Sequence, residues 1–295
     1  MKIGFIGLGI MGEAMCGNII RKHPDQVLIY DIDQDKAEKL YHMAVEEGRS
    51  NVRVCKDHRE LAAASDMIIS MVPKSEHARS VYETILPELN ADKVCIDMST
   101  IDPSVSVEIS RMVKQTGADF ADAPVVKSRP AAEKGALGIY VGCEEGTFDK
   151  ILPVLSYMGE NIIRMGDNGN GLVMKICHNA LVSQIQNGVN ETASLAKAAG
   201  IDVLTFAKAI SYGGGQNFYL DSKKNVIEQE DFKAAFSIEN MHKDVHIALN
   251  LAEEYGVYMP GEENAVRVYD QAMEKGYGKE DFSATIKVVR EGKKA

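Results

Sequence analysis

The sequence predicts an α/β N-terminal domain with a doubly wound, mostly parallel sheet, followed by an all-α C-terminal domain. Three observations predict this fold class. Short β-rich runs alternate with helix-forming stretches up to about residue 165, a glycine-rich loop follows the first run, and strand signals cease after residue 171. The length of 295 residues also exceeds the usual size of one domain.

Eight runs rich in Val, Ile, Tyr and Phe are the expected strands. They are residues 2–9, 26–31, 52–56, 66–73, 93–99, 118–124, 137–143 and 161–166. Helical stretches lie between several of them, at 10–20, 33–47, 75–89 and 104–116. Repeated alternation of strand and helix produces a parallel sheet with right-handed crossovers.

An uninterrupted helix-forming stretch from Leu172 to Gly200 predicts a helix of about 28 residues, roughly 42 Å long. Further helices are expected at 203–211, 221–228, 237–255 and 260–275. The predicted domains are therefore an α/β domain at 1–165 and a helical domain at 166–295, the latter including an interdomain helix at about 169–199.

The composition excludes several classes of partner. Acidic residues outnumber basic ones, 43 to 33, which gives a formal net charge of −10. Such a surface repels nucleic-acid phosphates and anionic membranes, so neither is an expected partner. The five cysteines are odd in number and lack CxxC spacing, and no apolar run reaches the roughly 18 residues of a membrane helix. We expect a cytoplasmic protein with reduced thiols.

The sequence GLGIMG, residues 7–12, has the glycine spacing of a dinucleotide-binding loop. It follows an expected strand, opens an expected helix, and precedes Asp31 at the end of the next strand, 19 residues after Gly12. That context is the Rossmann fingerprint, although a strand-turn-helix without a ligand is the alternative. Gly7 permits the tight turn, Gly9 lets the backbone approach the pyrophosphate, and Gly12 allows close packing of helix on strand.

Asp31 indicates NAD rather than NADP as the cofactor. Its carboxylate can accept hydrogen bonds from both ribose hydroxyls and repels a 2′-phosphate, and no arginine follows it directly. The expected cofactor contacts in this region are Gly7, Leu8, Gly9, Ile10, Met11, Gly12 and Asp31.

Six ordered motifs resemble those of the β-hydroxyacid dehydrogenase family, which includes 3-hydroxyisobutyrate dehydrogenase, tartronate semialdehyde reductase and relatives of 6-phosphogluconate dehydrogenase. They are GFIGLGIMG at 4–12, MVP at 71–73, DMST at 97–100, DAPV at 122–125, GNGLVMKICHN at 169–179 and HKD at 242–244. The resemblance spans nearly the whole chain. It implies an NAD-dependent enzyme that interconverts a small anionic 3-hydroxy acid and its semialdehyde, and a helical domain that builds homodimers or homotetramers.

Carried over by position, the resemblance implies that Lys175 is the catalytic lysine and Asn179 its substrate-orienting partner. It also implies cofactor contacts from Val72, Pro73, Thr100 and Lys243. Hydride addition to a carbonyl leaves negative charge on oxygen, which requires a proton donor within hydrogen-bond reach, and a lysine can supply that proton.

Lys175 and Asn179 are four residues apart and share one face of the expected helix. Ser183, Gln186 and Asn190 continue this polar face. If the helix is buried, these groups need partners in a substrate pocket or in a polar seam of the core. The alternative is the solvent-facing side of an ordinary amphipathic helix.

After DAPV, where most of the family continues with Ser-Gly-Gly, this chain departs from the pattern. The expected substrate-binding residues here are Val126, Lys127 and Ser128, and Arg129 follows. Two cations beside an anion pocket would suit a sulfonate, a phosphate or a second carboxylate, and the 3-sulfolactaldehyde reductase branch resembles this chain in placing a basic residue there. Alternatively, both side chains point to solvent and the substrate is of the 3-hydroxyisobutyrate or tartronate semialdehyde type.

No metal site is predicted. His242 and His246 are four residues apart, a spacing that can chelate a metal on a helix, but HKDVH lacks the glutamate of HExxH and no third ligand is evident. Two rival functions stay open. One is an imine reductase on the same fold, against which the retained Lys175 counts, and the other is a non-catalytic dinucleotide-binding protein.

Overall fold

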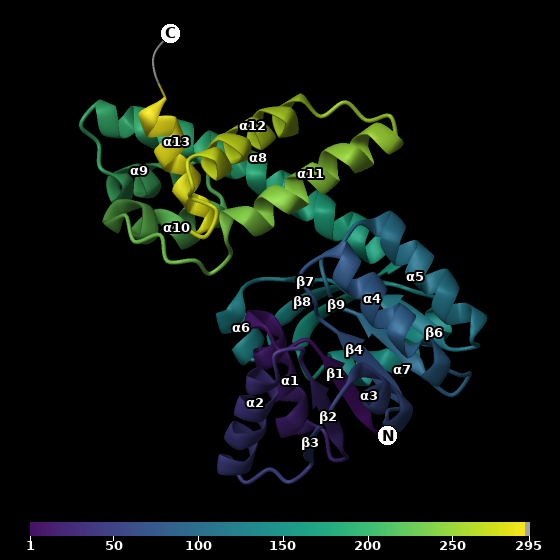
Figure 1. The fold of residues 1–295 in the computed structure, drawn as a ribbon. Helices are drawn as coiled ribbons and strands as arrows, with labels where there is room; N and C mark the ends of the chain where they lie inside the picture. Colours follow the sequence, from purple (N-terminus) through teal and green to yellow (C-terminus); the bar gives the residue numbers. More distant parts are fainter. Residues whose placement is uncertain (293–295) are drawn as a thin grey trace. The chain divides into compact units, whose positions relative to one another are not determined.

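The computed structural model describes residues 1–292 (Figure 1). They form two compact units, one of residues 1–175 and a second that begins at Ile176. The division falls within the long helix α8 (Asn170–Ala198). The last three residues of the predicted helical domain, 293–295, lie outside the described residues.

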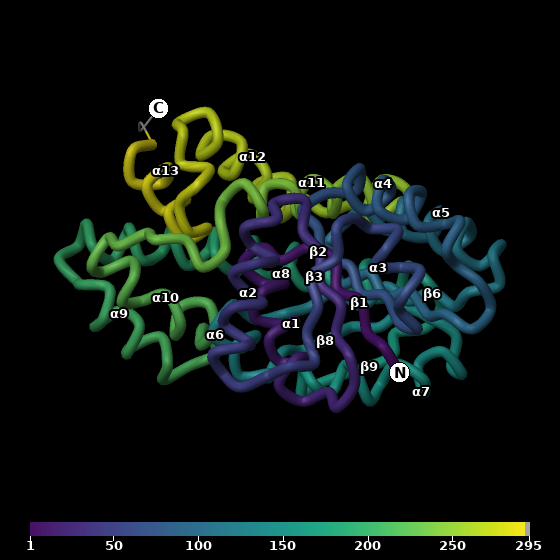
Figure 2. Tube along the Cα trace, turned by 60° about the horizontal axis from the view of Figure 1, so that its bottom comes forward, coloured from purple at the N-terminus to yellow at the C-terminus, as the bar shows by residue number. Residues whose placement is uncertain are grey.

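The first unit is built on one nine-stranded sheet in the order β3-β2-β1-β4-β5-β6-β8-β7, in which β9 also pairs with β8. The strands are β1 (Ile3–Ile6), β2 (Val27–Tyr30), β3 (Val52–Val54), β4 (Met67–Ser70), β5 (Val94–Asp97), β6 (Asp119–Asp122), β7 (Val125–Val126), β8 (Leu137–Gly142) and β9 (Gly159–Gly166). Strands β1 to β6 are parallel, and β8 is antiparallel to β6 and β7. Figure 2 shows β1, β2 and β3 side by side.

Helices cover both faces of this sheet (Figure 1). They are α1 (Ile10–Lys22), α2 (Gln34–Glu46), α3 (His58–Ala64), α4 (Ser75–Ile85), α5 (Pro103–Gln115), α6 (Arg129–Glu133) and α7 (Glu145–Leu155), with the 3-10 helix η1 (Leu86–Glu88). Alternate strand residues point to opposite faces, so that Ile3 and Phe5 pack with α1 and α2, whereas Ile6 packs with α3, α4 and α5. Because both faces are buried, the strands are continuous apolar runs.

The predicted fold class of the first unit is confirmed, and each expected strand is present. The sequence analysis did not name β7, α3, α6 or α7. Strand β7 has two residues and α6 has five, too few for a periodic pattern, and α7 contains Pro153, which is normally a sign that a helix ends.

The second unit is helical. Besides the rest of α8 it contains α9 (Val203–Ile210), α10 (Phe218–Gln229), α11 (Ile238–Glu254), α12 (Pro260–Glu274), the 3-10 helix η2 (Phe282–Thr285) and α13 (Ile286–Glu291). Asp202, Asn217 and Ser237 each cap a helix by accepting a hydrogen bond from a backbone N–H three residues later. Between Ile176 and Gly292 the chain forms no strand, which confirms the predicted all-α character. The sequence analysis did not foresee η2 or α13.

The predicted long helix is present as α8, with 29 residues. Gly169 precedes it with φ 97° and Gly200 follows it with φ 89°, backbone conformations that glycine adopts without strain. No helix within residues 1–292 combines the length and the apolar character needed to cross a membrane.

Buried polar side chains on α8 form a seam inside the second unit. Ser183, Gln186 and Asn190 are at most 1% exposed, which excludes the solvent-facing alternative. Ser183 Oγ donates to Glu262 Oε2 at 2.7 Å, and the Tyr269 hydroxyl donates to Gln186 Oε1 at 2.6 Å. Asn190 Nδ2 donates to Thr285 Oγ1 at 3.0 Å, so all three side chains take partners from the helical core.

Glu262 is the acidic member of this seam. It is fully buried, and burial raises its pKa to about 7, outweighing the hydrogen bonds from Ser183 and Gln184 that lower it. The Ser183 hydroxyl lies 2.7 Å from both Ala180 O and Glu262 Oε2, and its single proton can serve one of them. A protonated Glu262 supplies the second proton.

We expect Glu262 to make folding stability fall as pH rises. Because the folded state raises its pKa from 4.5 to about 7, the stabilising contribution is complete below pH 4.5 and is lost as pH rises towards 7. In the Glu262→Gln variant the side chain keeps its shape and is neutral at every pH. The variant should therefore lose this pH-dependent change in the free energy of unfolding, which is on the order of 2 kcal/mol. Urea unfolding of both proteins at pH 4.5 and 7 measures it. An equal stability difference at both pH values would contradict the assignment.

Candidate functional site

The loop between β1 and α1 is shaped by two glycines that the fold cannot replace. Gly7 has φ 95°, and a Cβ there would lie 2.2 Å from the carbonyl oxygen of Met71. A Cβ on Gly12 would lie 2.0 Å from the carbonyl oxygen of Gly7. Both glycines are therefore required by the turn and by the packing of α1 on β1, whether or not a ligand binds.

Gly9 differs from these two glycines. Apart from the two chain neighbours of Gly9, none of the described residues places an atom within 4 Å of a Cβ built there, so the space beside Gly9 is open. Gly9 is also the N-cap of α1, and no side chain within residues 1–292 caps that helix end. A helix N-terminus with open space before it offers backbone N–H groups and a partial positive charge to an anion.

Asp31 closes β2 beside this loop and is 7% exposed. Its carboxylate accepts hydrogen bonds from the backbone N–H of Leu8 at 2.6 Å and of Asp33 at 2.9 Å. The half-exposed ammonium of Lys36 lies 3.9 Å from Asp31 Oδ1. The predicted acid and the predicted glycine loop are thus held together directly.

The loops after β4 and β5 carry the other expected cofactor contacts of the first unit, Val72, Pro73 and Thr100. Val72 N–H donates to Ser99 Oγ at 2.8 Å, and Ser99 Oγ–H donates to Asp97 Oδ1 at 2.6 Å. Asp97 is fully buried, and burial raises its pKa against the hydrogen bonds from Ser99 and Ser70. This network, which the sequence analysis did not name, connects the two loops.

Asp122 closes β6 and binds the start of α8. Its Oδ1 accepts from Gly169 N–H at 2.6 Å and its Oδ2 from Leu172 N–H at 3.0 Å. Burial raises the pKa of this carboxyl to about 6, although both backbone donors lower it. Lys175 follows on α8 and is 8% exposed. The sequence analysis quoted Asp122 within DAPV without a role, and its place at the end of an apolar strand was the available signal.

The carboxyl ends of parallel strands meet at one edge of a sheet. That edge carries the 7–12 loop after β1, Asp31 after β2, Val72 and Pro73 after β4, Thr100 after β5 and the Asp122 anchor of α8 after β6. The order of strands reverses at β1, between β2 and β4, which is where ligands bind in doubly wound sheets. Most of the predicted site residues of the first unit therefore share one edge.

The remaining predicted residues of the helical unit meet at a buried acid. Asn179 Nδ2 donates to Asp244 Oδ2 at 2.7 Å, and Lys243 Nζ lies 2.9 Å from Asp244 Oδ1. Asp244 is 1% exposed, so α8 and α11 are joined by a carboxylate between an amide and an ammonium. The sequence analysis found the HKD motif but gave no role to its aspartate.

The basic loop after DAPV is bound to its own unit. Lys127 has φ 79°, and its Nζ donates to the carbonyl oxygen of Ala136 at 2.6 Å. Arg129 Nε donates to Glu133 at 2.8 Å, and one of its terminal nitrogens lies 3.3 Å from Glu13. Both side chains are exposed. Of the three predicted substrate residues, Val126 belongs to β7, and Ser128 is the N-cap of α6.

The residues of the first unit fit a dinucleotide. The open space at Gly9, the uncapped start of α1 and the buried carboxylate of Asp31 are suited to a pyrophosphate and a ribose respectively. A family model described as the NAD-binding domain of 6-phosphogluconate dehydrogenase matches residues 2–166. A second, described as NAD-binding of NADP-dependent 3-hydroxyisobutyrate dehydrogenase, matches residues 169–289.

The chain belongs to the β-hydroxyacid dehydrogenase family. It is 32% identical to 2-(hydroxymethyl)glutarate dehydrogenase from Eubacterium barkeri, over 98% of this chain and 94% of that protein. It is also 32% identical to mitochondrial 3-hydroxyisobutyrate dehydrogenase from Mus musculus, over 98% and 87% of the two chains. The resemblance deduced from the motifs is therefore confirmed, and this dehydrogenase uses a nicotinamide cofactor.

Solved structures agree with this family membership. A structure of Mycobacterium tuberculosis 3-hydroxyisobutyrate dehydrogenase with L-serine matches with a TM-score of 0.89 and 27% identity, covering 98% of this chain and 99% of that one. An imine reductase from Pseudomonas sp. matches with a TM-score of 0.64 and 19% identity, covering 97% and 98%. At that identity the second likeness concerns the fold alone.

We expect the Gly9→Ala variant to fold normally and to bind NADH at least about tenfold more weakly. The added methyl group meets no atom of the described residues, and φ of −67° suits alanine, so the cost falls on the ligand. Gly12→Ala is the matched control, because its methyl group collides with the backbone of Gly7 and should lower the melting temperature. NADH fluorescence titration and thermal unfolding measure both effects. Normal NADH affinity in Gly9→Ala would contradict this role of Gly9.

Proposed function

We propose that this protein is an NAD-dependent dehydrogenase that interconverts a small 3-hydroxy acid and its semialdehyde, with Lys175 as proton donor and acceptor. The observation that carries the proposal is a buried lysine on the helix that Asp122 anchors at the nucleotide-binding edge of the sheet. A lysine at this position can donate a proton to a reacting oxygen and take it back in the reverse direction.

The division of roles follows from the chemistry. The nicotinamide cofactor supplies or accepts the hydride. Lys175 donates a proton to the carbonyl oxygen during reduction and, when neutral, removes the hydroxyl proton during oxidation. Asn179 stands one helical turn further on α8, where its amide orients the substrate while Asp244 fixes the side chain. Lys243, whose ammonium lies beside the same carboxylate, is the cofactor contact that the family motif implies.

The substrate class is a 3-hydroxy acid with a primary alcohol. By their names, two relatives act on 2-(hydroxymethyl)glutarate and 3-hydroxyisobutyrate, and a third was solved with L-serine. These compounds share a hydroxymethyl group on the carbon that bears the carboxylate. The backbone after DAPV would bind that carboxylate, with Val126 and Ser128 beside it. Because Lys127 already donates to Ala136 O, a carboxylate substrate is favoured over 3-sulfolactaldehyde, which is the alternative.

Replacing Lys175 with alanine should lower kcat at least about a hundredfold, the lower range for loss of a general acid or base. NADH affinity should stay unchanged, because the cofactor is held by the first unit's loops. Stopped-flow absorbance of NADH and fluorescence titration separate the two quantities. Substantial residual turnover would reject Lys175 as the proton donor.

The Lys127→Gly variant distinguishes the two substrate classes. If Lys127 is structural, turnover of methylmalonate semialdehyde and tartronate semialdehyde changes less than about threefold, and 3-sulfolactaldehyde is a poor substrate of both proteins. Loss of the lysine at positive φ also relieves backbone strain of order 1 kcal/mol, which offsets the lost hydrogen bond to Ala136 O. A selective loss of 3-sulfolactaldehyde turnover, by tenfold or more in kcat/KM, would establish the sulfonate alternative.

Cofactor preference tests the role of Asp31. Its buried carboxylate should repel the 2′-phosphate of NADPH, so kcat/KM with NADH should exceed that with NADPH by at least about tenfold. Initial rates with both cofactors at fixed semialdehyde measure the ratio. Equal or higher efficiency with NADPH would show that the exposed Lys36 nearby compensates for the acid.

The helical unit supports a homodimer or homotetramer as the assembled form. Large apolar side chains are exposed on its helices and the loops between them, namely Leu181, Leu195, Leu204, Tyr212, Phe218 and Tyr258. Exposed apolar surface of this kind is typical of protein interfaces. A cytoplasmic location stays a prediction.

A further inference from the structure

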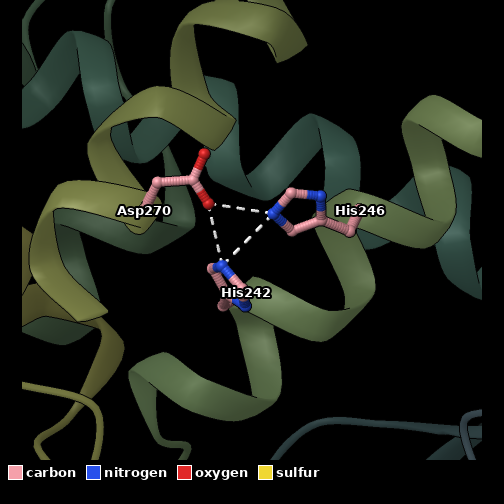
Figure 3. A group of neighbouring side chains, drawn as sticks. All are labelled: His242, His246 and Asp270. Carbon is pink, nitrogen blue, oxygen red and sulfur yellow. Dashed lines mark hydrogen bonds and ion pairs between the residues drawn. The ribbon is translucent and has the colours of Figure 1, made fainter. Parts of the chain in front are cut away.

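Two histidines and an aspartate converge in the helical unit, outside the proposed active site (Figure 3). His242 and His246 lie one turn apart on α11, and Asp270 faces them from α12. Both Nε2 atoms point at Asp270 Oδ1, at 2.8 Å from His242 and 2.9 Å from His246. The two Nε2 atoms are 3.2 Å apart. Asp270 is the third polar group of this cluster, and the sequence analysis did not find it.

We propose that this cluster is a binding site for a divalent transition-metal ion, zinc above all, that joins α11 to α12. Ligand atoms about 2.0–2.1 Å from a tetrahedral zinc lie roughly 3.3 Å from one another. The three observed separations of 2.8, 2.9 and 3.2 Å need little expansion to reach that geometry. Movements of a few tenths of an ångström within side-chain rotamers suffice.

The chemistry of the donors selects the kind of ion. Two imidazole nitrogens and one carboxylate oxygen suit zinc and its neighbours, whereas magnesium and calcium prefer oxygen ligands alone. Two neutral imidazoles and one carboxylate carry a net charge of −1, which favours a dication.

Without a metal ion, hydrogen bonds can hold the two Nε2 atoms beside Asp270 Oδ1, and a bound ion would replace these hydrogen bonds. Each Nε2–H can donate to Asp270 Oδ1, which then accepts from both rings at once. When a metal ion binds, each neutral ring carries its proton on Nδ1 instead of Nε2, after exchange with solvent, and the freed Nε2 lone pair coordinates the ion. The side chains are 28%, 45% and 42% exposed for His242, His246 and Asp270, so an ion has access from solvent and water can fill the fourth position.

Isothermal titration of tag-free, EDTA-treated full-length protein with zinc chloride tests the site. The background is Cys177→Ser, because Cys177 is an exposed thiol that can bind zinc itself. We expect one zinc ion per chain. His246→Gln and Asp270→Asn each remove a ligand, so each should lower the zinc affinity by more than the roughly 10–100-fold that is typical of losing a residue that only hydrogen-bonds to a ligand. The matched control His42→Gln, an exposed histidine on α2, should bind zinc like its parent.

Thermal unfolding gives a second, independent readout. Zinc at about a hundred times its Kd should raise the melting temperature of the parent by roughly 5 °C and leave that of Asp270→Asn unchanged. Magnesium should not raise the melting temperature of either protein. The half-exposed positions of the three side chains make folded variants the expected case, and circular dichroism without metal verifies this. Absence of stoichiometric zinc binding, or equal affinity in parent, His246→Gln and Asp270→Asn, would overturn the proposal. Zinc binding that disappears with Cys177→Ser alone would assign it to the thiol and overturn it as well.

Discussion

The carboxylate of Asp122 at the carboxyl end of β6 is the point on which the candidate site depends. It accepts hydrogen bonds from the N–H groups of Gly169, which directly precedes α8, and of Leu172 in its first turn, at the end of the helix dipole that favours a negative charge. Gly142 and Gly171 leave it room, because a Cβ on either would lie within 2.8 Å of a carboxylate oxygen. The sheet therefore determines where α8 begins, and with it the position of Lys175 in the first unit.

A second buried acid, Asp244, connects two helices in the helical unit. Asp244 binds Asn179 of α8 through one oxygen and Lys243 of α11 through the other. Further along α8, the seam that ends at Glu262 and Tyr269 fixes the rotation of the helix about its axis, because a small turn would leave several buried polar groups without partners. Apolar packing supplies most of the stability of such a helix, and these polar contacts specify one orientation of it.

The functional groups of the first unit lie on the loops at one edge of the sheet, as is usual in doubly wound folds. Burial of both faces accounts for the sheet and its helices, and leaves the loops at one edge available for ligand binding. The hydrogen-bond chain from Val72 through Ser99 to Asp97 shows how such loops are made rigid before a ligand arrives. The histidine cluster joins α11 to α12, and both helices belong to the helical unit.

The sequence by itself determined the features that depend on neighbouring residues in the chain. Glycine spacing with Asp31 at a fixed distance identified the nucleotide loop, apolar runs identified the strands, and the uninterrupted helical stretch identified α8, because turns, strands and helices depend on neighbouring residues. Lys175 was named through the motif that surrounds it, and its catalytic role remains a proposal. Short elements such as α6, and α7 with its internal Pro153, were beyond this approach.

The tertiary structure alone decided the contacts between residues far apart in the chain. Asp122 meets Gly169, Asn179 meets Asp244, and Asp270 meets His242 because separate elements fold together, and nothing in the local pattern of either partner specifies the other. The direction of the Lys127 ammonium was open for the same reason. The sequence placed a cation beside an expected anion pocket, whereas the folded chain turns it to a backbone carbonyl.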